Sequence, residues 1–183
     1  MMISLAHSSR MMRRFARDTR GVSAVEFALV LPLMITLYVG TTEVSQAITA
    51  SRKGTLVART VGDLASQVSS ISNASMNDIL KASSAIVAPF SPVNLKVTVS
   101  CVTIDANGKA TVSWSDTFQG AAHGKGSAVT LPPALNVANT SIIWTEVQYN
   151  YTPTIGYVLT GTFALKNEMY MRPRLSDTIT RTS

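Results

Sequence analysis

The stretch that decides the fold is Arg20-Gly21-Val22-Ser23-Ala24-Val25-Glu26-Phe27, followed by Ala28-Leu-Val-Leu-Pro-Leu-Met-Ile-Thr-Leu-Tyr-Val39. Residues 22–39 form the only strongly apolar run of the chain. As a helix, a run of about 18 residues rises roughly 27 Å, just enough to cross the hydrocarbon core of a bilayer. The run contains a single carboxylate, Glu26, and a charge at that depth costs roughly 2.5–3.5 kcal/mol. The sequence therefore predicts a membrane-spanning helix in which Glu26 has a functional partner.

The arginines of the chain are concentrated before this run. Five of them lie within residues 1–21, and few basic residues follow the run directly. The positive-inside rule therefore predicts a cytoplasmic N-terminus and a C-terminal domain on the outer side of the membrane. The small residue Gly21 precedes the apolar run, whereas a secretory signal has its cleavage site after the run. Cleavage after Gly21 leaves the anchor on the mature chain, with Val22 as its first residue and Glu26 one helical turn away.

Removal of residues 1–21 also changes the charge of the chain. The full sequence carries a formal net charge of +6, whereas residues 22–183 hold 11 basic and 9 acidic residues, a net charge of +2. Most of the basic character thus belongs to the leader. Nucleic-acid binding needs a basic stripe on a folded face, so we expect no nucleic-acid partner.

One segment resembles a known family. Asp18-Thr-Arg-Gly-Val-Ser-Ala-Val-Glu-Phe-Ala-Leu-Val-Leu-Pro-Leu-Met34 is similar to the start of a TadE-like protein, a minor pseudopilin of the tight-adherence (Flp pilus) apparatus. The Arg-Gly pair, the Ala24–Leu29 core and the Leu31-Pro32 step match the pattern of that family, and the similarity covers about residues 18–45. A weaker similarity lies in Tyr149-Asn-Tyr-Thr-Pro153 and in Met171-Arg-Pro-Arg174.

The resemblance implies a function in pilus biogenesis. A prepilin peptidase would cut between Gly21 and Val22, and Glu26, with Phe27 beside it, would serve assembly by meeting the Val22 amine of a neighbouring subunit. The implied partners are the prepilin peptidase, other pilins or pseudopilins and the lipid bilayer. The implied location is the bacterial inner membrane, as a single-pass protein with a periplasmic C-terminal domain, in the pilus or at its base. The implied outcome is assembly of Flp-type pili and surface attachment.

The chain is expected to contain a leader at 1–21, a transmembrane segment at 22–42, an amphipathic helix extension at 43–71 and an outer domain at 72–183. Small or apolar residues recur through the extension with alternating spacings of three and four, which is a heptad seam. The seam residues are Ala47, Ala50, Gly54, Val57, Val61, Leu64, Val68 and Ile71. We expect this seam to pack on the protein's own sheet, with a coiled coil to another subunit as the alternative.

The outer domain is predicted to be α+β, with a short helix over 76–87 and four antiparallel strands against the long helix. Alternating apolar residues indicate strands at 94–104, 110–115 and 140–151, and another at 156–165 that continues toward Met171. Asn107-Gly108 indicates a hairpin turn between the first two strands. The tyrosines around Pro153, namely Tyr149, Tyr151 and Tyr157, are expected to form a packed strand corner.

The sequence offers no constellation typical of catalysis, a metal site or a cofactor site, and we expect no enzymatic activity. The only cysteine, Cys101, lies in an alternating strand pattern and is predicted to be a buried small residue. Two rival functions remain at this stage. The chain could be an uncleaved membrane-anchored sensor or adhesion protein with a ligand-binding outer domain, or, as a last choice, a membrane-tethered hydrolase.

Overall fold

The computed structural model describes residues 20–182, so residues 1–19 of the predicted leader lie outside the described part. The chain divides into two compact units, one ending at Thr42 and the other beginning at Glu43. The second unit holds the sheet, whose strands follow the long helix in the sequence. The predicted α+β class, with a long N-terminal apolar helix followed by a four-stranded antiparallel sheet, is confirmed.

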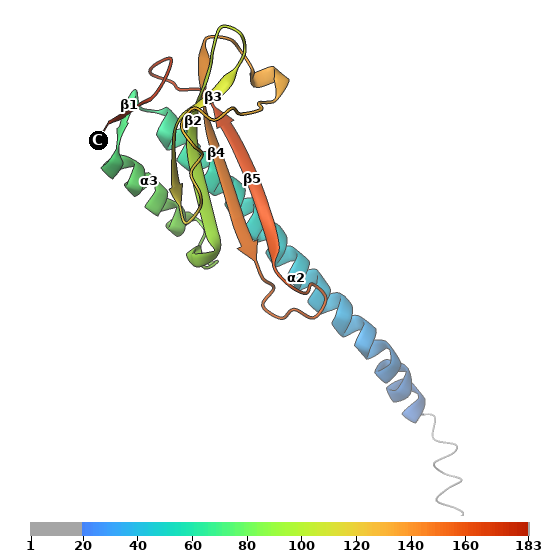
Figure 1. The fold of residues 1–183 in the computed structure, drawn as a ribbon. Helices are drawn as coiled ribbons and strands as arrows, with labels where there is room; N and C mark the ends of the chain where they lie inside the picture. Colours follow the sequence, from blue (N-terminus) through green and yellow to red (C-terminus); the bar gives the residue numbers. More distant parts are fainter. Residues whose placement is uncertain (1–19, 183) are drawn as a thin grey trace, which may run out of the picture. The chain divides into compact units, whose positions relative to one another are not determined.

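The long helix, α2, runs without interruption over Arg20–Ser66 and contains Pro32 (Figure 1). The predicted extension of this helix to residue 71 is wrong. Residues 70–72 instead form a short strand, β1 (Ser70–Ser72), which pairs in parallel with β6 (Thr180–Thr182). The run of serines after Gln67 favours the end of the helix, because serine hydroxyls compete for backbone hydrogen bonds. The partner strand lies 110 residues away in the sequence and could not be inferred from local pattern.

Ion pairing and side-chain bonds hold the C-terminal strand β6 in place. The guanidinium of Arg181 donates to both carboxylate oxygens of Asp116 at 2.9 Å and to the carbonyl of Ile71 at 2.9 Å. The indole N–H of Trp114 donates to the carbonyl of Ile179 at 2.7 Å, and the Ile179 side chain is 1% exposed. Ile179, directly before β6, is therefore part of the core, which the sequence alone did not indicate.

The main sheet has the strand order β3-β2-β4-β5, with every neighbouring pair antiparallel. The strands are β2 (Leu95–Ile104), β3 (Ala110–Phe118), β4 (Thr140–Tyr151) and β5 (Phe163–Met171). The predicted hairpin between β2 and β3 is confirmed, and Gly108 has the positive φ of 78° that such a turn favours. The fourth strand begins at Phe163, later than predicted, because Pro153 and two glycines with positive φ shape residues 152–162 as a loop.

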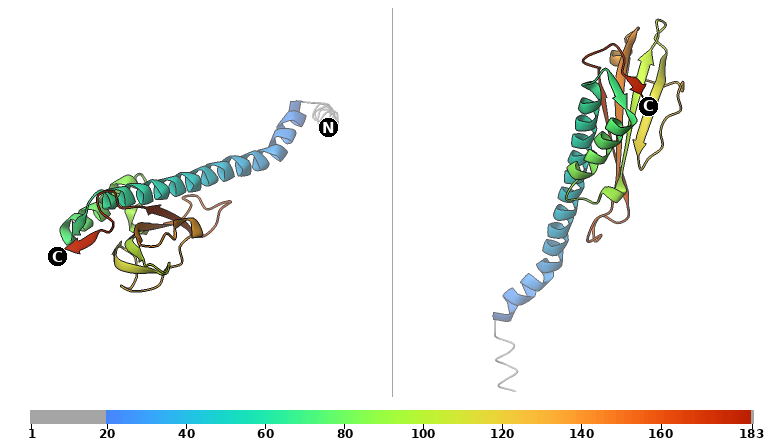
Figure 2. Two further views of the ribbon diagram at one scale, coloured as in Figure 1. Left: turned by 90° about the horizontal axis from the view of Figure 1, so that it is seen from above. Right: turned by 90° about the vertical axis from the view of Figure 1, so that its left-hand side faces the viewer.

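A second helix, α3 (Asn73–Ile86), follows β1 and begins three residues earlier than predicted. The hydroxyl of Ser72 caps it by accepting a hydrogen bond from the Ser75 amide at 3.1 Å. Its buried face, which includes Met76 and Leu80, joins the core. In Figure 2, α3 and the later part of α2 lie on the same face of the sheet.

The core lies between this sheet face and the two helices. From α2 it includes Val57, Ala58 and Val61, and from the two central strands it includes alternate residues such as Val97 and Ile143. All five side chains are fully buried. The residues after Glu43 thus use one face of α2 to cover the sheet of the same chain, so the seam packs on the protein's own sheet, as expected.

Val68 and Ile71 of the predicted seam lie beyond the end of α2, and within α2 the register differs from the prediction at Leu64. Leu64 is 38% exposed, whereas Ala65 and Ala58 are fully buried. An α-helix has 3.6 residues per turn, so a strict heptad drifts around a straight helix and a sheet-covering face follows the helical period instead. A ridge of small residues at four-residue spacing runs along the covered face and consists of Ala50, Gly54, Ala58, Gly62 and Ser66. We call these five residues the small-residue ridge.

Two glycines of the ridge let the helix approach the sheet closely. A Cβ added at Gly54 would lie 2.5 Å from Nδ2 of Asn167, and one added at Gly62 would lie 2.9 Å from Oγ1 of Thr145. Real Cβ atoms essentially never approach another heavy atom this closely. A side chain at either position would therefore force Asn167 or Thr145, or the helix itself, to shift.

We predict that Val61→Asp and Leu64→Asp have opposite outcomes in a fragment of residues 42–183. A charge at fully buried Val61 has no partner and should cost several kcal/mol, comparable to the whole stability of a small domain, so this variant should not fold. Leu64→Asp places the same group at a half-exposed position and should lower the melting temperature by only a few degrees. Circular dichroism melts of both variants against the parent measure this difference, and equal destabilisation would contradict the observed helix face.

Candidate functional site

The apolar residues of the first unit are exposed on every side of the helix. All side chains from Gly21 to Ile35 are exposed, and Leu29, Leu33 and Leu37 are 76%, 60% and 62% exposed. An 18-residue window here has a mean hydropathy of 2.0, and none of it is buried among the described residues. The helix is long and apolar enough to cross a membrane, by length and composition. An apolar surface of this extent needs a lipid or protein environment that the described chain does not itself supply.

The threonine side chains of this segment are bonded back to the helix. The hydroxyls of Thr36, Thr41 and Thr42 donate to the carbonyls of Pro32, Leu37 and Val39 at 2.7–2.8 Å. In an apolar environment an unpaired hydroxyl is costly, and this local pairing removes the cost. Pro32 removes one backbone donor inside the helix, a feature that membrane helices tolerate better than soluble ones. The segment is therefore chemically suited to burial in lipid apart from Glu26.

The predicted processing and assembly residues lie on the first turns of α2. Val22 and Glu26 are four residues apart, so their side chains share one face of the helix. Glu26 is exposed, and among residues 20–182 no basic group forms an ion pair with it. No atom lies within 4 Å of a Cβ built at Gly21, and Val22 and Phe27 are 53% and 58% exposed. The four residues are accessible to a partner, and their roles remain predictions.

A second carboxylate, Glu43, was missed by the sequence analysis and is the first residue of the second unit. Its side chain is buried, with 2% exposure. Its two oxygens accept hydrogen bonds from three consecutive backbone amides: Tyr157 at 2.8 Å, Val158 at 3.0 Å and Leu159 at 2.7 Å. These N–H groups, that of Leu159 foremost, lower the pKa of the Glu43 carboxyl, against the opposing effect of its burial. Glu43 is thus an ionised acceptor that fixes the β4–β5 loop to α2.

The tyrosine corner next to this loop is only partly as predicted. Tyr149 and Tyr151 are each 3% exposed, and the ring of Phe90 packs edge-on against both, with centroid distances of 5.9 and 6.4 Å. Tyr157, in contrast, is 64% exposed. The expectation that Tyr157 belongs to the packed corner is wrong, because its amide is directed to Glu43 and its ring lies in the exposed loop.

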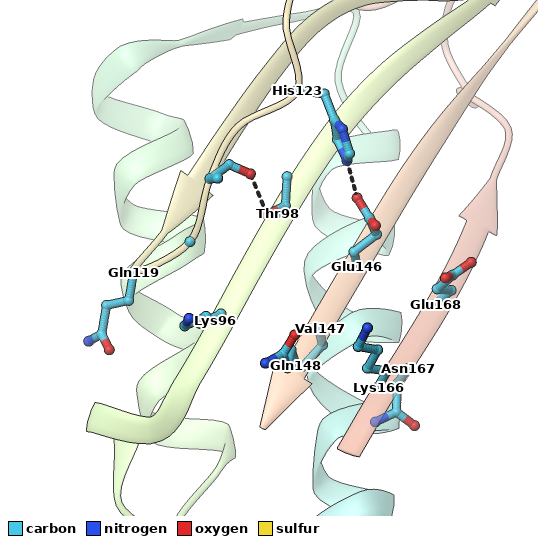
Figure 3. Close-up of a pocket in the computed structure, with 12 residues that line it drawn as sticks. Lys96, Thr98, Gln119, His123, Glu146, Val147, Gln148, Lys166, Asn167 and Glu168 are labelled. Carbon is cyan, nitrogen blue, oxygen red and sulfur yellow. Dashed lines mark hydrogen bonds and ion pairs between the residues drawn. The ribbon is translucent and has the colours of Figure 1, made fainter. Parts of the chain in front are cut away.

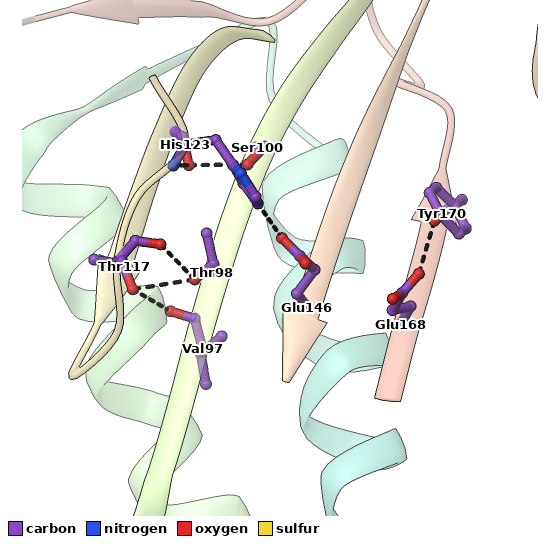
Figure 4. Close-up of polar contacts among 10 residues, drawn as sticks. Val97, Thr98, Ser100, Thr117, His123, Glu146, Glu168 and Tyr170 are labelled. Atoms are coloured by element: carbon purple, nitrogen blue, oxygen red, sulfur yellow. Dashed lines mark hydrogen bonds and ion pairs between the residues drawn. The ribbon is translucent and has the colours of Figure 1, made fainter. Parts of the chain in front are cut away.

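The face of the sheet that the two helices leave uncovered carries an open polar groove of about 510 Å³ (Figure 3). His123 forms an ion pair with Glu146 and stacks on Trp144, with ring centroids 4.8 Å apart. The hydroxyl of Tyr170 donates to Glu168 at 2.8 Å, as Figure 4 shows, and burial together with this carboxylate raises the pKa of Tyr170 to about 12.

Each acid of this groove is bonded to a neighbouring side chain that is not a lysine. Lys96 and Lys166 lie among its lining residues together with Glu146 and Glu168. Glu146 and Glu168 lie directly opposite each other on β4 and β5, Lys96 and Lys166 both lie opposite Gln148, and both acids already have partners. Such a mixed surface selects no particular charge of ligand. Within the described residues, no group of three or more His, Cys, Asp or Glu side chains is arranged to hold a metal ion.

Cys101 has the position that the sequence predicted. It lies on β2 in the core, fully buried, with Sγ 3.9 Å from Oγ1 of Thr178. Burial raises the pKa of its thiol, which keeps the thiol protonated. The side chain acts as a small apolar core residue.

Comparison with known proteins identifies one part of the chain. A family model described as TadE-like protein matches residues 21–62, which is most of α2. No curated protein and no solved structure matches the chain. The matched segment contains Gly21, Val22, Glu26 and Phe27 together with most of the small-residue ridge. The resemblance seen in the sequence is confirmed over this segment: residues 21–62 are similar to TadE-like proteins.

Proposed function

We propose that the protein is a minor pseudopilin that supports assembly of Flp-type pili and surface attachment. The observation that carries the proposal is the fully exposed apolar helix surface of residues 21–35, interrupted by one carboxylate, within the TadE-like match. In this proposal the helix anchors the chain in the bacterial inner membrane, with the N-terminus in the cytoplasm and the sheet domain in the periplasm. Its partners are a prepilin peptidase, other pilins or pseudopilins and lipid.

Processing comes first in the proposed sequence of events. The peptidase hydrolyses the Gly21–Val22 peptide bond, which leaves a new ammonium group on Val22. Because Val22 and Glu26 are one turn apart on the same helix face, each mature subunit then carries a positive and a negative group near the start of its helix. The Glu26 carboxylate of one subunit pairs with the Val22 ammonium of its neighbour. An unpaired charge in that apolar setting costs about 3–5 kcal/mol, so the pair favours one register of neighbouring helices.

The proposed work of the protein is packing rather than turnover. The groove on the outer sheet face pairs its acids with neighbouring side chains, and the thiol of Cys101 is buried in the core. Both features suit a structural subunit. We therefore propose no enzymatic activity and no cofactor, and we assign the apolar helix surface as the part that assembles.

We predict that Gly21→Arg blocks processing when the protein is produced together with its prepilin peptidase. A long charged side chain at this position would clash with a peptidase site that closes on the glycine backbone. Intact-mass measurement should then find residues 1–21 removed from the parent chain and retained on Gly21→Arg. Gly21→Ala is the matched control and should still be cut. A parent chain that keeps residues 1–21 in the presence of active peptidase would refute the pseudopilin assignment and favour an uncleaved anchored protein.

We predict that Glu26→Gln and Glu26→Ala insert into the membrane as well as the parent or better, because a costly charge is gone. Both variants should be processed but should give few or no pili, since the neighbouring ammonium group loses its partner. Glu26→Asp is the control that retains the charge and should preserve part of the assembly. Pili counted by electron microscopy, at equal protein levels by immunoblot, measure the effect. Normal piliation by Glu26→Gln would exclude the proposed pairing.

A further inference from the structure

The loop between β4 and β5 exposes apolar side chains without a single charge. Its sequence, residues 152–162, is Thr-Pro-Thr-Ile-Gly-Tyr-Val-Leu-Thr-Gly-Thr. Ile155, Tyr157 and Val158 are 62%, 64% and 44% exposed, and Phe163, which begins β5, is 40% exposed. Scattered exposed apolar residues are ordinary, but a cluster of them on one uncharged loop indicates a contact surface.

The same loop is fixed at one level of α2. Three of its amides, those of residues 157–159, donate to the buried carboxylate of Glu43. The hydroxyl of Tyr151, at the end of β4, lies 3.5 Å from the carbonyl of Glu43. Glu43 directly follows the predicted transmembrane segment, residues 22–42, in one uninterrupted helix. Each helical residue adds about 1.5 Å, so the loop is attached within one turn of the end of that segment.

The side-chain chemistry of the loop suits the boundary between lipid headgroups and acyl chains. Tyrosine is enriched at this depth because its ring is apolar and its hydroxyl remains in contact with water. The threonines supply further hydroxyls, and the absence of Asp, Glu, Lys and Arg removes the groups that would resist insertion. The one carboxylate at this level, Glu43, is enclosed by the loop amides and presents no charge to lipid.

We propose that residues 152–162 are a second membrane contact, in which Ile155, Tyr157 and Val158 enter the headgroup–acyl boundary beside the point where α2 leaves the bilayer. This inference rests on the membrane span of the proposed function. Glu43 is the positioning residue, since its bonds to the loop backbone hold these side chains at the level of the helix exit. A single helix allows a domain to tilt freely, and a second lipid contact restricts that freedom.

The test uses the intact chain reconstituted into vesicles of phosphatidylethanolamine and phosphatidylglycerol. Single cysteines at three positions carry an environment-sensitive fluorophore: Ile155→Cys in the loop, Leu33→Cys in the apolar segment and Leu175→Cys as the matched control. Leu175 is 70% exposed and neighbours Arg174, whose amide donates to the carbonyl of Ser66 at 3.0 Å. Ser66 lies about 35 Å further along the helix than Glu43. Cys101 is fully buried and should not react with the fluorophore, so the parent chain serves as the control for background labelling.

Lipids with a nitroxide near the headgroup should quench the label at position 155, lipids with a nitroxide deep in the acyl chain should quench the label at position 33, and neither should quench the label at position 175. Quenching at 33 but not at 155 would overturn the loop contact while leaving the membrane span intact. Absence of quenching at 33 would instead refute the span, and with it the basis of this inference. The emission of the label at 155 could instead shift to shorter wavelength as the protein density in the vesicles rises, without quenching by lipid. That result would assign the loop to a contact between subunits and would also overturn the proposal.

A second variant tests the role of Glu43. Glu43→Gln replaces a carboxylate that accepts three amide hydrogen bonds with an amide that has a single acceptor oxygen. In this background, quenching at 155 should fall while quenching at 33 stays the same. Unchanged quenching at 155 would show that Glu43 does not set the depth of the loop and would overturn its assignment as the positioning residue.

Discussion

The close approach of α2 to strands β4 and β5 is the constraint on which the rest of the structure depends. The small-residue ridge brings the helix so near the sheet that a Cβ at Gly54 or Gly62 would force the side chain of Asn167 or Thr145 to shift. This approach lets Val57 and Val61 reach the apolar face of the central strands. It also buries the hydroxyl of Thr145 below Gly62, where no described group pairs with it. An unpaired buried hydroxyl costs about 1–3 kcal/mol, which the surrounding apolar burial must outweigh.

One continuous helix thus meets two different requirements along its length. Apart from Ser23, Glu26 and Thr36, residues 22–39 are apolar, and none of them is buried among the described residues, so that part needs lipid or neighbouring subunits. Beyond Glu43 the helix has one buried face and one exposed face, with Val57 fully buried and Leu56 47% exposed. The transition coincides with Glu43, whose carboxylate binds the β4–β5 loop instead of solvent. The helix that carries the family resemblance is therefore also the element that organises the sheet domain.

Local pattern in the sequence predicted most of the sheet. The third expected strand, at residues 140–151, coincides with β4, because a strand with one covered face alternates buried and exposed residues along the sequence. The same reasoning placed Leu64 on the buried face wrongly, since a spacing of three and four residues is compatible with several nearby helix faces. It also missed the pairing of β1 with β6 and the Glu43 contact. Both join residues more than 100 positions apart, and no short window of sequence contains them.

The roles of Gly21, Val22, Glu26 and Phe27 rest on family resemblance, because they depend on partners outside this chain.

The central claim is that α2 changes environment near residue 43, from apolar contact on every side to one-sided packing on its own sheet. The most direct measurement is a scan of single cysteines along residues 22–66 in reconstituted vesicles, with a water-soluble maleimide on both sides of the membrane. The account predicts no reaction at any position from 22 to 39. From residue 44 it predicts that reactivity toward maleimide varies with the period of the helix. Cysteines at the exposed positions Val44, Ile48 and Leu56 should react, and those at the buried positions Val57, Val61 and Ala65 should not. Reaction on only one face of the helix through residues 22–39, or reaction at every position there, would contradict this claim.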